Sequence, residues 1–260
     1  MTFAVRKGSS LGIVGESGSG KSTVAKSLVG LVRAQTGSIA LDGKLLYDPV
    51  RMSSAVRARI QYIFQDSYGA LNPRLTVEQL IGEAFAISGK PRHERRDAIT
   101  ALLEEVGLGG THLDRLPREL SGGQRQRVNI ARALALSPQL LICDEIVSAL
   151  DVSIQAQILN LLRELQRKRS LTLVFISHDL AVVSQLCDRI IVMQAGKVVE
   201  EGQAGDVLGA PREPYTQKLL AAAMALDQRD ERKFSQLDPD RSFISPAASE
   251  TQQDVGALSI

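Results

Sequence analysis

Short apolar runs recur along the chain, and each has a length that suits a buried strand. They are residues 11–14, 60–64, 140–143 and 171–176, with weaker strands at 2–6 and 38–41 and a hairpin at 190–199. Between them, apolar residues follow a helical period in residues 24–32, 75–107 and 154–165, and again after Ser121. Strands that alternate with helices predict an α/β fold with a mainly parallel sheet.

The chain divides into one large domain and a polar end. We expect a domain over residues 1–226, with an inserted helical subdomain at about 66–136. From residue 227 to residue 260 the chain is polar, with few periodic apolar residues, which predicts a mobile C-terminal tail.

A glycine-rich loop, GESGSGKST, joins the strand at 11–14 to the helix at 24–32. In this context glycines let backbone N–H groups converge on a phosphate, and the helix N-terminus adds positive potential. Lys21 is expected to reach the β- and γ-phosphates, and the Ser22 hydroxyl to bind Mg²⁺. Both flanking elements argue against a glycine turn without a ligand. The predicted nucleotide contacts are Gly15, Ser17, Gly18, Ser19, Gly20, Lys21, Ser22 and Thr23.

Two carboxylates, Asp144 and Glu145, follow the strand at 140–143. Ligands of parallel α/β sheets bind at the carboxyl ends of the strands. Asp144 therefore suits the Mg²⁺ site, and Glu145 is placed to polarise an attacking water. An Asp-Glu pair alone is more often a solvated strand end, but the phosphate loop in the same chain favours function.

A helix is predicted to start after Ser121, which has the capping-box spacing to Gln124. Gly122 and Gly123 lie just inside this helix, where each costs about 1 kcal/mol relative to Ala. The simplest interpretation is a helix cap, but the glycines indicate that something approaches the backbone closely. The N–H groups of a helix start suit an anion, so we expect a second anion site, for a nucleotide bound to another copy.

Two further polar residues end predicted strands. Gln65 follows the run at 60–64 and, taken alone, is a polar strand terminus. His178 follows the strand at 171–176, and a lone histidine there is usually structural. Because it lies beside the expected γ-phosphate, its imidazole is also placed to hydrogen-bond a phosphate oxygen.

Composition and charge argue against several classes of protein. The chain of 260 residues has 31 basic and 29 acidic residues and no Trp, which gives no support for a nucleic-acid binder. It has no run that could span a bilayer and no signal peptide, so we expect a cytoplasmic chain that docks on a membrane protein. Cys143 and Cys187 lie in apolar runs and are expected to be buried thiols.

The order and spacing of these motifs resemble the ATP-binding subunits of ABC transporters. Residues 15–23 match Walker A, Gln65 the Q-loop, 120–124 the signature motif, 140–145 Walker B, 148–151 the D-loop and His178 the switch histidine. The match covers about residues 2–225. The stretches 64–66, 71–74, 211–216 and 219–220 resemble the oligopeptide, dipeptide and nickel importer group.

The resemblance implies a fold and a site. The fold is a P-loop NTPase core with an antiparallel β subdomain and an inserted helical subdomain. Two subunits would clamp two ATP molecules head to tail, with the signature motif of one facing Lys21 of the other. The implied roles are catalysis for Lys21, Glu145 and His178, Mg²⁺ binding for Ser22, Gln65 and Asp144, and nucleotide binding for Gln65, Ser121, Gly122, Gly123 and Asp151 besides the loop.

The chain departs from the family pattern at two places. The first strand of the usual domain is missing, together with the aromatic residue that stacks on adenine, and neither Tyr47 nor Tyr62 is at the equivalent position. We expect ATP affinity to fall several-fold, because one stacked ring contributes about 1 kcal/mol, and one sheet edge to be open. A truncated start and a genuine short form explain the gap equally well. Ile146 replaces the usual Pro, with little expected effect, and two cysteines cannot hold the iron–sulfur cluster of some relatives.

The resemblance also implies a function. The chain would hydrolyse ATP to drive an importer, with peptides as the first choice of cargo and nickel or metal chelates as the second. Its partners would be two membrane-spanning permease subunits, a second ATPase subunit and an external substrate-binding protein, at the cytoplasmic face of the inner membrane. The helical insertion at 65–87 would contact the permease. The alternatives are a soluble ATPase acting on DNA or ribosomes, and a weakly active subunit of a mixed pair.

Overall fold

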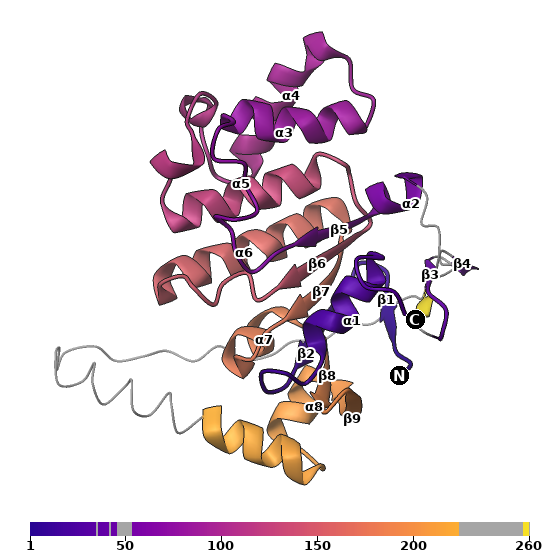
Figure 1. The fold of residues 1–260 in the computed structure, drawn as a ribbon. Coiled ribbons are helices and arrows are strands. Elements are labelled where there is room, and N and C mark those ends of the chain that lie inside the picture. Colours follow the sequence, from indigo (N-terminus) through magenta and orange to yellow (C-terminus); the bar gives the residue numbers. More distant parts are fainter. Residues whose placement is uncertain (35, 42, 46–53, 224–256, 260) are drawn as a thin grey trace, which may run out of the picture.

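A six-stranded sheet forms the centre of the molecule (Figure 1). The computed structural model describes residues 1–34, 36–41, 43–45, 54–223 and 257–259. Along the sheet the strands are β5 (Ile60–Ile63), β6 (Leu140–Asp144), β7 (Thr172–Ile176), β2 (Ser10–Val14), β8 (Arg189–Gln194) and β9 (Lys197–Gln203). The first five are parallel, and β9 forms an antiparallel hairpin with β8. The predicted mainly parallel α/β fold and the hairpin are confirmed.

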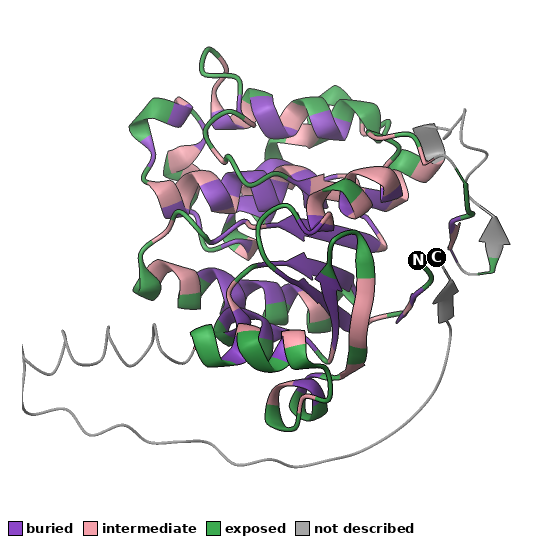
Figure 2. Ribbon diagram, turned by 60° about the horizontal axis from the view of Figure 1, so that its bottom comes forward, coloured by how far each residue is buried: buried purple, intermediate pink, exposed green. Residues whose placement is uncertain are grey.

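Helices cover both faces of this sheet, and the strands are buried between them (Figure 2). On one face α1 (Lys21–Leu28) packs on Leu140 and Ile142 of β6. On the other face Leu141 and Cys143 join a larger core. The helices of that core include α5 (Gly122–Leu134), α6 (Val152–Arg169) and α7 (Leu180–Leu186). Successive side chains of a strand point to opposite faces, so alternate residues of β6 belong to different cores.

A helical subdomain lies beyond the β5 edge of the sheet (Figure 1). It contains α3 (Val77–Ile87), α4 (Arg92–Glu105), two short 3₁₀ turns at Gly110–His112 and Pro117–Glu119, and α5. Helix α3 begins with a capping box between Thr76 and Gln79. Its buried face, Leu80 and Ile81 among others, packs with α4 and α5 in the larger core. The structure therefore has the helical insertion that the sequence predicts between strands.

The remaining elements are short. They are β1 (Ala4–Arg6), β3 (Ala40–Leu41), β4 (Lys44–Leu45), α2 (Ser54–Arg59), α8 (Ala204–Gly209), β10 (Ala257–Ser259) and a helix over residues 214–223. β3 pairs antiparallel with β4, and β1 pairs antiparallel with β10. Residues 227–256 and 260 of the predicted tail, and Tyr47, lie outside the described residues.

The helix after the glycine loop differs from its predicted bounds of 24–32. It starts at Lys21, directly after Gly20, and ends at Leu28. Gly30 follows with a φ of 71°, a left-handed conformation that stops the helix. Within the described ranges, none of the helices is long and apolar enough to cross a membrane.

Candidate active site

The glycine loop connects β2 to α1, and its glycines are required by its backbone. Gly15, Gly18 and Gly20 have φ values of 151°, 81° and 100°, a region that other residues rarely adopt. At Gly15 a β-carbon would also lie 2.2 Å from the backbone oxygen of Met193 on β8. No side chain caps the start of α1 at Gly20, so the first N–H groups of the helix remain free for a ligand.

Lys21 folds back over this loop. Its Nζ donates hydrogen bonds to the carbonyl oxygens of Gly15 and Glu16, at 2.7 and 2.8 Å, and lies 3.4 Å from Ser19 Oγ. The residue is only 4% exposed. Burial lowers the pKa of Lys21, and the negative charges of Glu145 and Asp144 partly offset this effect. The chain thus keeps a buried ammonium group at the loop. A phosphate oxygen can replace one of the carbonyl oxygens as its hydrogen-bond acceptor.

Asp144 ends β6 beside the first turn of α1. Its side chain points to the α1 face, as the alternation along β6 requires, and the residue is 5% exposed. Ser22 Oγ donates a hydrogen bond to Asp144 Oδ1 at 3.0 Å. The Tyr62 hydroxyl donates a short hydrogen bond to Asp144 Oδ2. The structure therefore brings together two of the predicted metal ligands, Ser22 and Asp144, and adds Tyr62.

Glu145 is held between Gln65 and His178. Gln65 Nε2 donates a hydrogen bond to Glu145 Oε2 at 2.9 Å, and His178 Nδ1 lies 3.5 Å from the same oxygen. Glu145 has a φ of 50°, an uncommon value for a non-glycine residue, and such outliers cluster at functional sites. The next residue, Ile146, is buried in the larger core. Gln65, predicted as a metal ligand, therefore contacts Glu145, whereas Ser22 and Asp144 contact each other.

The start of α5 has the predicted capping box. Ser121 Oγ accepts from the Gln124 N–H at 3.3 Å, and Gln124 Oε1 accepts from the Ser121 N–H at 2.9 Å. A β-carbon on Gly123 would lie 2.7 Å from Ile154 Cγ2, and one on Gly122 would lie 3.2 Å from Leu150 Cδ2. The close approach inferred from these glycines is thus made inside the chain, by the segment that begins α6.

Two predicted nucleotide contacts remain apart from the glycine loop. Ser121 is exposed at the start of α5, and Asp151 is exposed at the start of α6. Among the described residues, no hydrogen bond or ion pair joins either of them to residues 15–23. A single chain therefore offers two separate surfaces, the glycine loop and the start of α5.

The segment 211–216 contacts the glycine loop. The Glu16 N–H donates a hydrogen bond to the Tyr215 hydroxyl at 3.1 Å. The segment is fixed on β9, because Glu200 accepts the N–H groups of Arg212 and Glu213 at 2.8 and 3.3 Å. Sequence reasoning used residues 211–216 only as a sign of a subgroup and missed this contact.

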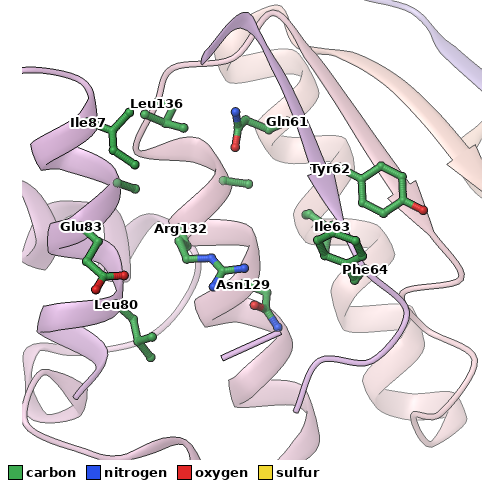
Figure 3. A pocket seen from close by; sticks show the side chains of 12 residues that line it. Gln61, Tyr62, Ile63, Phe64, Leu80, Glu83, Ile87, Asn129, Arg132 and Leu136 are labelled. Atoms are coloured by element: carbon green, nitrogen blue, oxygen red, sulfur yellow. The ribbon is translucent and has the colours of Figure 1, made fainter. Parts of the chain in front are cut away.

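A pocket of about 180 Å³ lies between β5 and the helical subdomain, and its lining includes Phe64, the residue before Gln65 (Figure 3). Leu80, Ala84 and Ile87 of α3 give it an apolar wall. Arg132 of α5 donates to the carbonyl oxygen of Ala70 at 2.6 Å; burial lowers the pKa of this arginine, and the charge of Glu83 acts in the opposite direction. The pocket combines apolar walls with a carboxylate and a guanidinium.

Both cysteines are buried and free, as predicted. Burial raises the pKa of the Cys143 and Cys187 thiols, which keeps them protonated and unreactive near neutral pH.

Comparison with known proteins places this chain in one family. Residues 1–148 match the ABC transporter family model. The chain is 45% identical over 236 residues to the oligopeptide transport ATP-binding protein OppF of Bacillus subtilis, covering 89% of this chain and 77% of that protein. It is 49% identical over 225 residues to OppF of Escherichia coli, covering 85% and 67%.

Similar matches extend to other proteins and to a solved structure. A putative peptide import ATP-binding protein of Brucella ovis is 44% identical over 238 residues, covering 90% of this chain and 75% of that protein. The structure of cbiO1 from Clostridium perfringens, part of the ABC transporter complex cbiONQ, matches with a TM-score of 0.72 and 29% identity, covering 79% and 81% of the two chains.

Proposed function

This chain belongs to the ABC transporter family, whose ATP-binding proteins are ATPases, and we propose that it hydrolyses ATP to drive an importer of peptides. The observation that carries the proposal is the joint placement of Ser22 with Asp144 and of Gln65 and His178 with Glu145. The choice of peptides rests on relatives named as oligopeptide transport and peptide import proteins.

The proposed nucleotide site uses the glycine loop and the donors beside it. Lys21 and the N–H groups at the start of α1 would hold the phosphates. The Ser22 hydroxyl and the Asp144 carboxylate suit Mg²⁺, which prefers oxygen ligands and shares them with substrate phosphates. Gln65 would complete the ligand set. Bound Mg²⁺ would supply positive charge against the negative charge of the phosphates.

The chemical step would depend on Glu145. Its carboxylate, held by Gln65 and close to His178, would orient a water by accepting a hydrogen bond from it. His178 would then donate a hydrogen bond to a phosphate oxygen. Most of the barrier reduction would come from positioning and charge, as in other phosphoryl transfers.

A second ATPase chain would complete each site. Ser121, Gly122, Gly123 and Asp151 would contact the nucleotide bound to the facing chain, which is either a second copy or a sister subunit. This arrangement is supported by the separation of the start of α5 from the glycine loop of the same chain.

The permease would dock in the pocket beside Gln65. Its apolar wall and the two charged residues Glu83 and Arg132 suit a short helix with apolar and polar side chains. Docking next to Gln65 would connect partner movement with the Glu145 carboxylate. The chain would then be a peripheral subunit on the cytoplasmic face of the membrane.

The substitution Glu145→Gln tests the catalytic assignment. In vesicles that contain the full assembly, we expect this variant to bind ATP as well as wild type and to lose at least 100-fold in hydrolysis and in peptide uptake, because the orienting carboxylate is gone. Glu164→Gln, an exposed site on α6, is the matched control. Hydrolysis at the wild-type rate in Glu145→Gln would remove Glu145 from the mechanism. Uptake of nickel chelates in place of peptides by the wild-type assembly would overturn the assignment of peptides as the cargo.

A further inference from the structure

The carboxylate of Asp144 has a separate partner for each oxygen. Oδ1 accepts from Ser22, which lies in the glycine-loop motif. Oδ2 accepts from Tyr62, which lies in none of the six sequence motifs. Since Asp144 is 5% exposed, water has little access to replace either partner.

The sheet places Tyr62 at this position. β5 and β6 are parallel neighbours, and Tyr62 is in register with Ile142, two residues before Asp144. The alternation of strand side chains puts Tyr62 and Asp144 on the α1 face of the sheet. Figure 3 shows Gln61 and Tyr62 pointing to opposite sides of β5.

The ring of Tyr62 is held as well as its hydroxyl. It packs against Phe64 with ring centroids 4.7 Å apart and an interplanar angle of 56°. A phenol O–H next to a carboxylate acts as the hydrogen-bond donor, so Tyr62 donates and Asp144 accepts. A carboxylate bonded at both oxygens cannot turn about its terminal torsion without breaking a hydrogen bond.

We propose that Tyr62 is a positioning residue for the metal site: its hydroxyl fixes Asp144 so that this carboxylate and the Ser22 hydroxyl face Mg²⁺ together. This inference rests on the proposed function. Partners that orient a ligand in this way typically change metal affinity by about 10- to 100-fold when they are removed.

The substitution Tyr62→Phe tests the role, because it keeps the ring on Phe64 and removes only the donor. Binding of a fluorescent N-methylanthraniloyl ATP to the full chain is measured without metal and then during a Mg²⁺ titration. We expect unchanged affinity without metal and a roughly 10-fold higher Mg²⁺ concentration at the midpoint. Tyr68→Phe, which removes the hydroxyl of an exposed tyrosine, should match wild type in both measurements.

A double-mutant cycle separates orientation of Asp144 from general packing. In an Asp144→Asn background the added Tyr62→Phe change should shift the Mg²⁺ midpoint by less than about 2-fold, because no carboxylate remains to be oriented. A Tyr62→Phe midpoint equal to wild type would overturn the inference, and so would an equal loss of affinity without metal. If wild type itself shows no Mg²⁺ dependence, the proposed metal site fails and the inference with it.

Discussion

Gly123 of α5 lies against Ile154 of α6. Its position is helical and needs no left-handed backbone, so the requirement for glycine comes from space alone. The methyl group Ile154 Cγ2, which would lie 2.7 Å from an added β-carbon, belongs to a β-branched side chain with little freedom to move. The packing of α5 on α6 therefore explains this glycine without any nucleotide.

The substitution Gly123→Ala is expected to lower the free energy of unfolding by about 1–3 kcal/mol, as overpacking does elsewhere. The higher helix propensity of Ala offsets about 1 kcal/mol of the cost of overpacking. In an Ile154→Ala background the same change should become neutral or stabilising, because the clashing methyl is gone. Urea unfolding of the four proteins measures the coupling, and equal effects in both backgrounds would contradict the packing explanation.

Residues that act through local sequence could be predicted, and residues that act through distant contacts could not. Lys21 and Ser121 follow from a loop and a helix cap, whose chemistry is set within a few neighbouring positions. Tyr62 and Tyr215 depend on contacts that span 82 and 199 positions of the chain. The alternation along 60–64 could have placed Tyr62 on the face of Asp144, but only with the order of the strands in hand.

At the scale of elements, ion pairs to Glu105 join the helical subdomain to the core: the main one is with Arg169, and Lys168 Nζ lies 3.8 Å from Glu105 Oε1. Arg169, the last residue of α6, donates from Nε to Glu105 Oε1 at 2.9 Å and from a terminal nitrogen to Glu105 Oε2, at the end of α4. The hydrogen bond from Arg169 lowers the pKa of Glu105 from its ordinary value of 4.5, although burial acts in the opposite direction. The folded chain therefore favours the ionised carboxylate.

The substitution Glu105→Gln is expected to lower the free energy of unfolding by about 1 kcal/mol at pH 7, the upper range for a partly exposed pair with two-point geometry. Because the folded pKa lies below 4.5, this stabilisation is present above pH 4.5 and is lost as the pH falls through the folded value. Urea unfolding at pH 7, 5 and 3.5 should show that the difference in free energy of unfolding between wild type and this variant becomes smaller as the pH falls. Glu104→Gln, at the adjacent exposed residue, is the control. A difference in free energy of unfolding that stays constant with pH would count against the ion pair.

The apolar strands and the long helix were predictable, and the short helices were not. The strands β2, β6 and β7 are continuous apolar runs, and α6 extends over 18 residues, so periodicity identified them. Helices α2, α7 and α8 have only 6 or 7 residues, too few to establish a helical period. The bounds of α1 depend on the backbone angles of Gly20 and Gly30, which the pattern of apolar residues does not predict.

At the scale of the whole molecule, the proposed site is divided between surfaces that one chain does not bring together. The glycine loop lies on the α1 side of the sheet, whereas Ser121 lies at the start of α5, a helix of the opposite face. Two chains facing head to tail would join each loop to the start of α5 of the other chain. This proposal predicts that nucleotide controls association.

The Glu145→Gln chain should be a monomer without nucleotide and should dimerise with ATP and Mg²⁺, as measured by light scattering after size exclusion. In this background Ser121→Asp and Ser121→Asn form a matched pair, since both side chains accept the Gln124 N–H as good N-caps. Asp adds a negative charge toward the phosphate of the facing chain, so it should weaken the dimer at least 10-fold more than Asn does. Binding of ATP to the monomer should be equal in the two variants, because Ser121 is separate from the loop of its own chain. Dimers of equal strength in both variants would mean that Ser121 does not face a nucleotide.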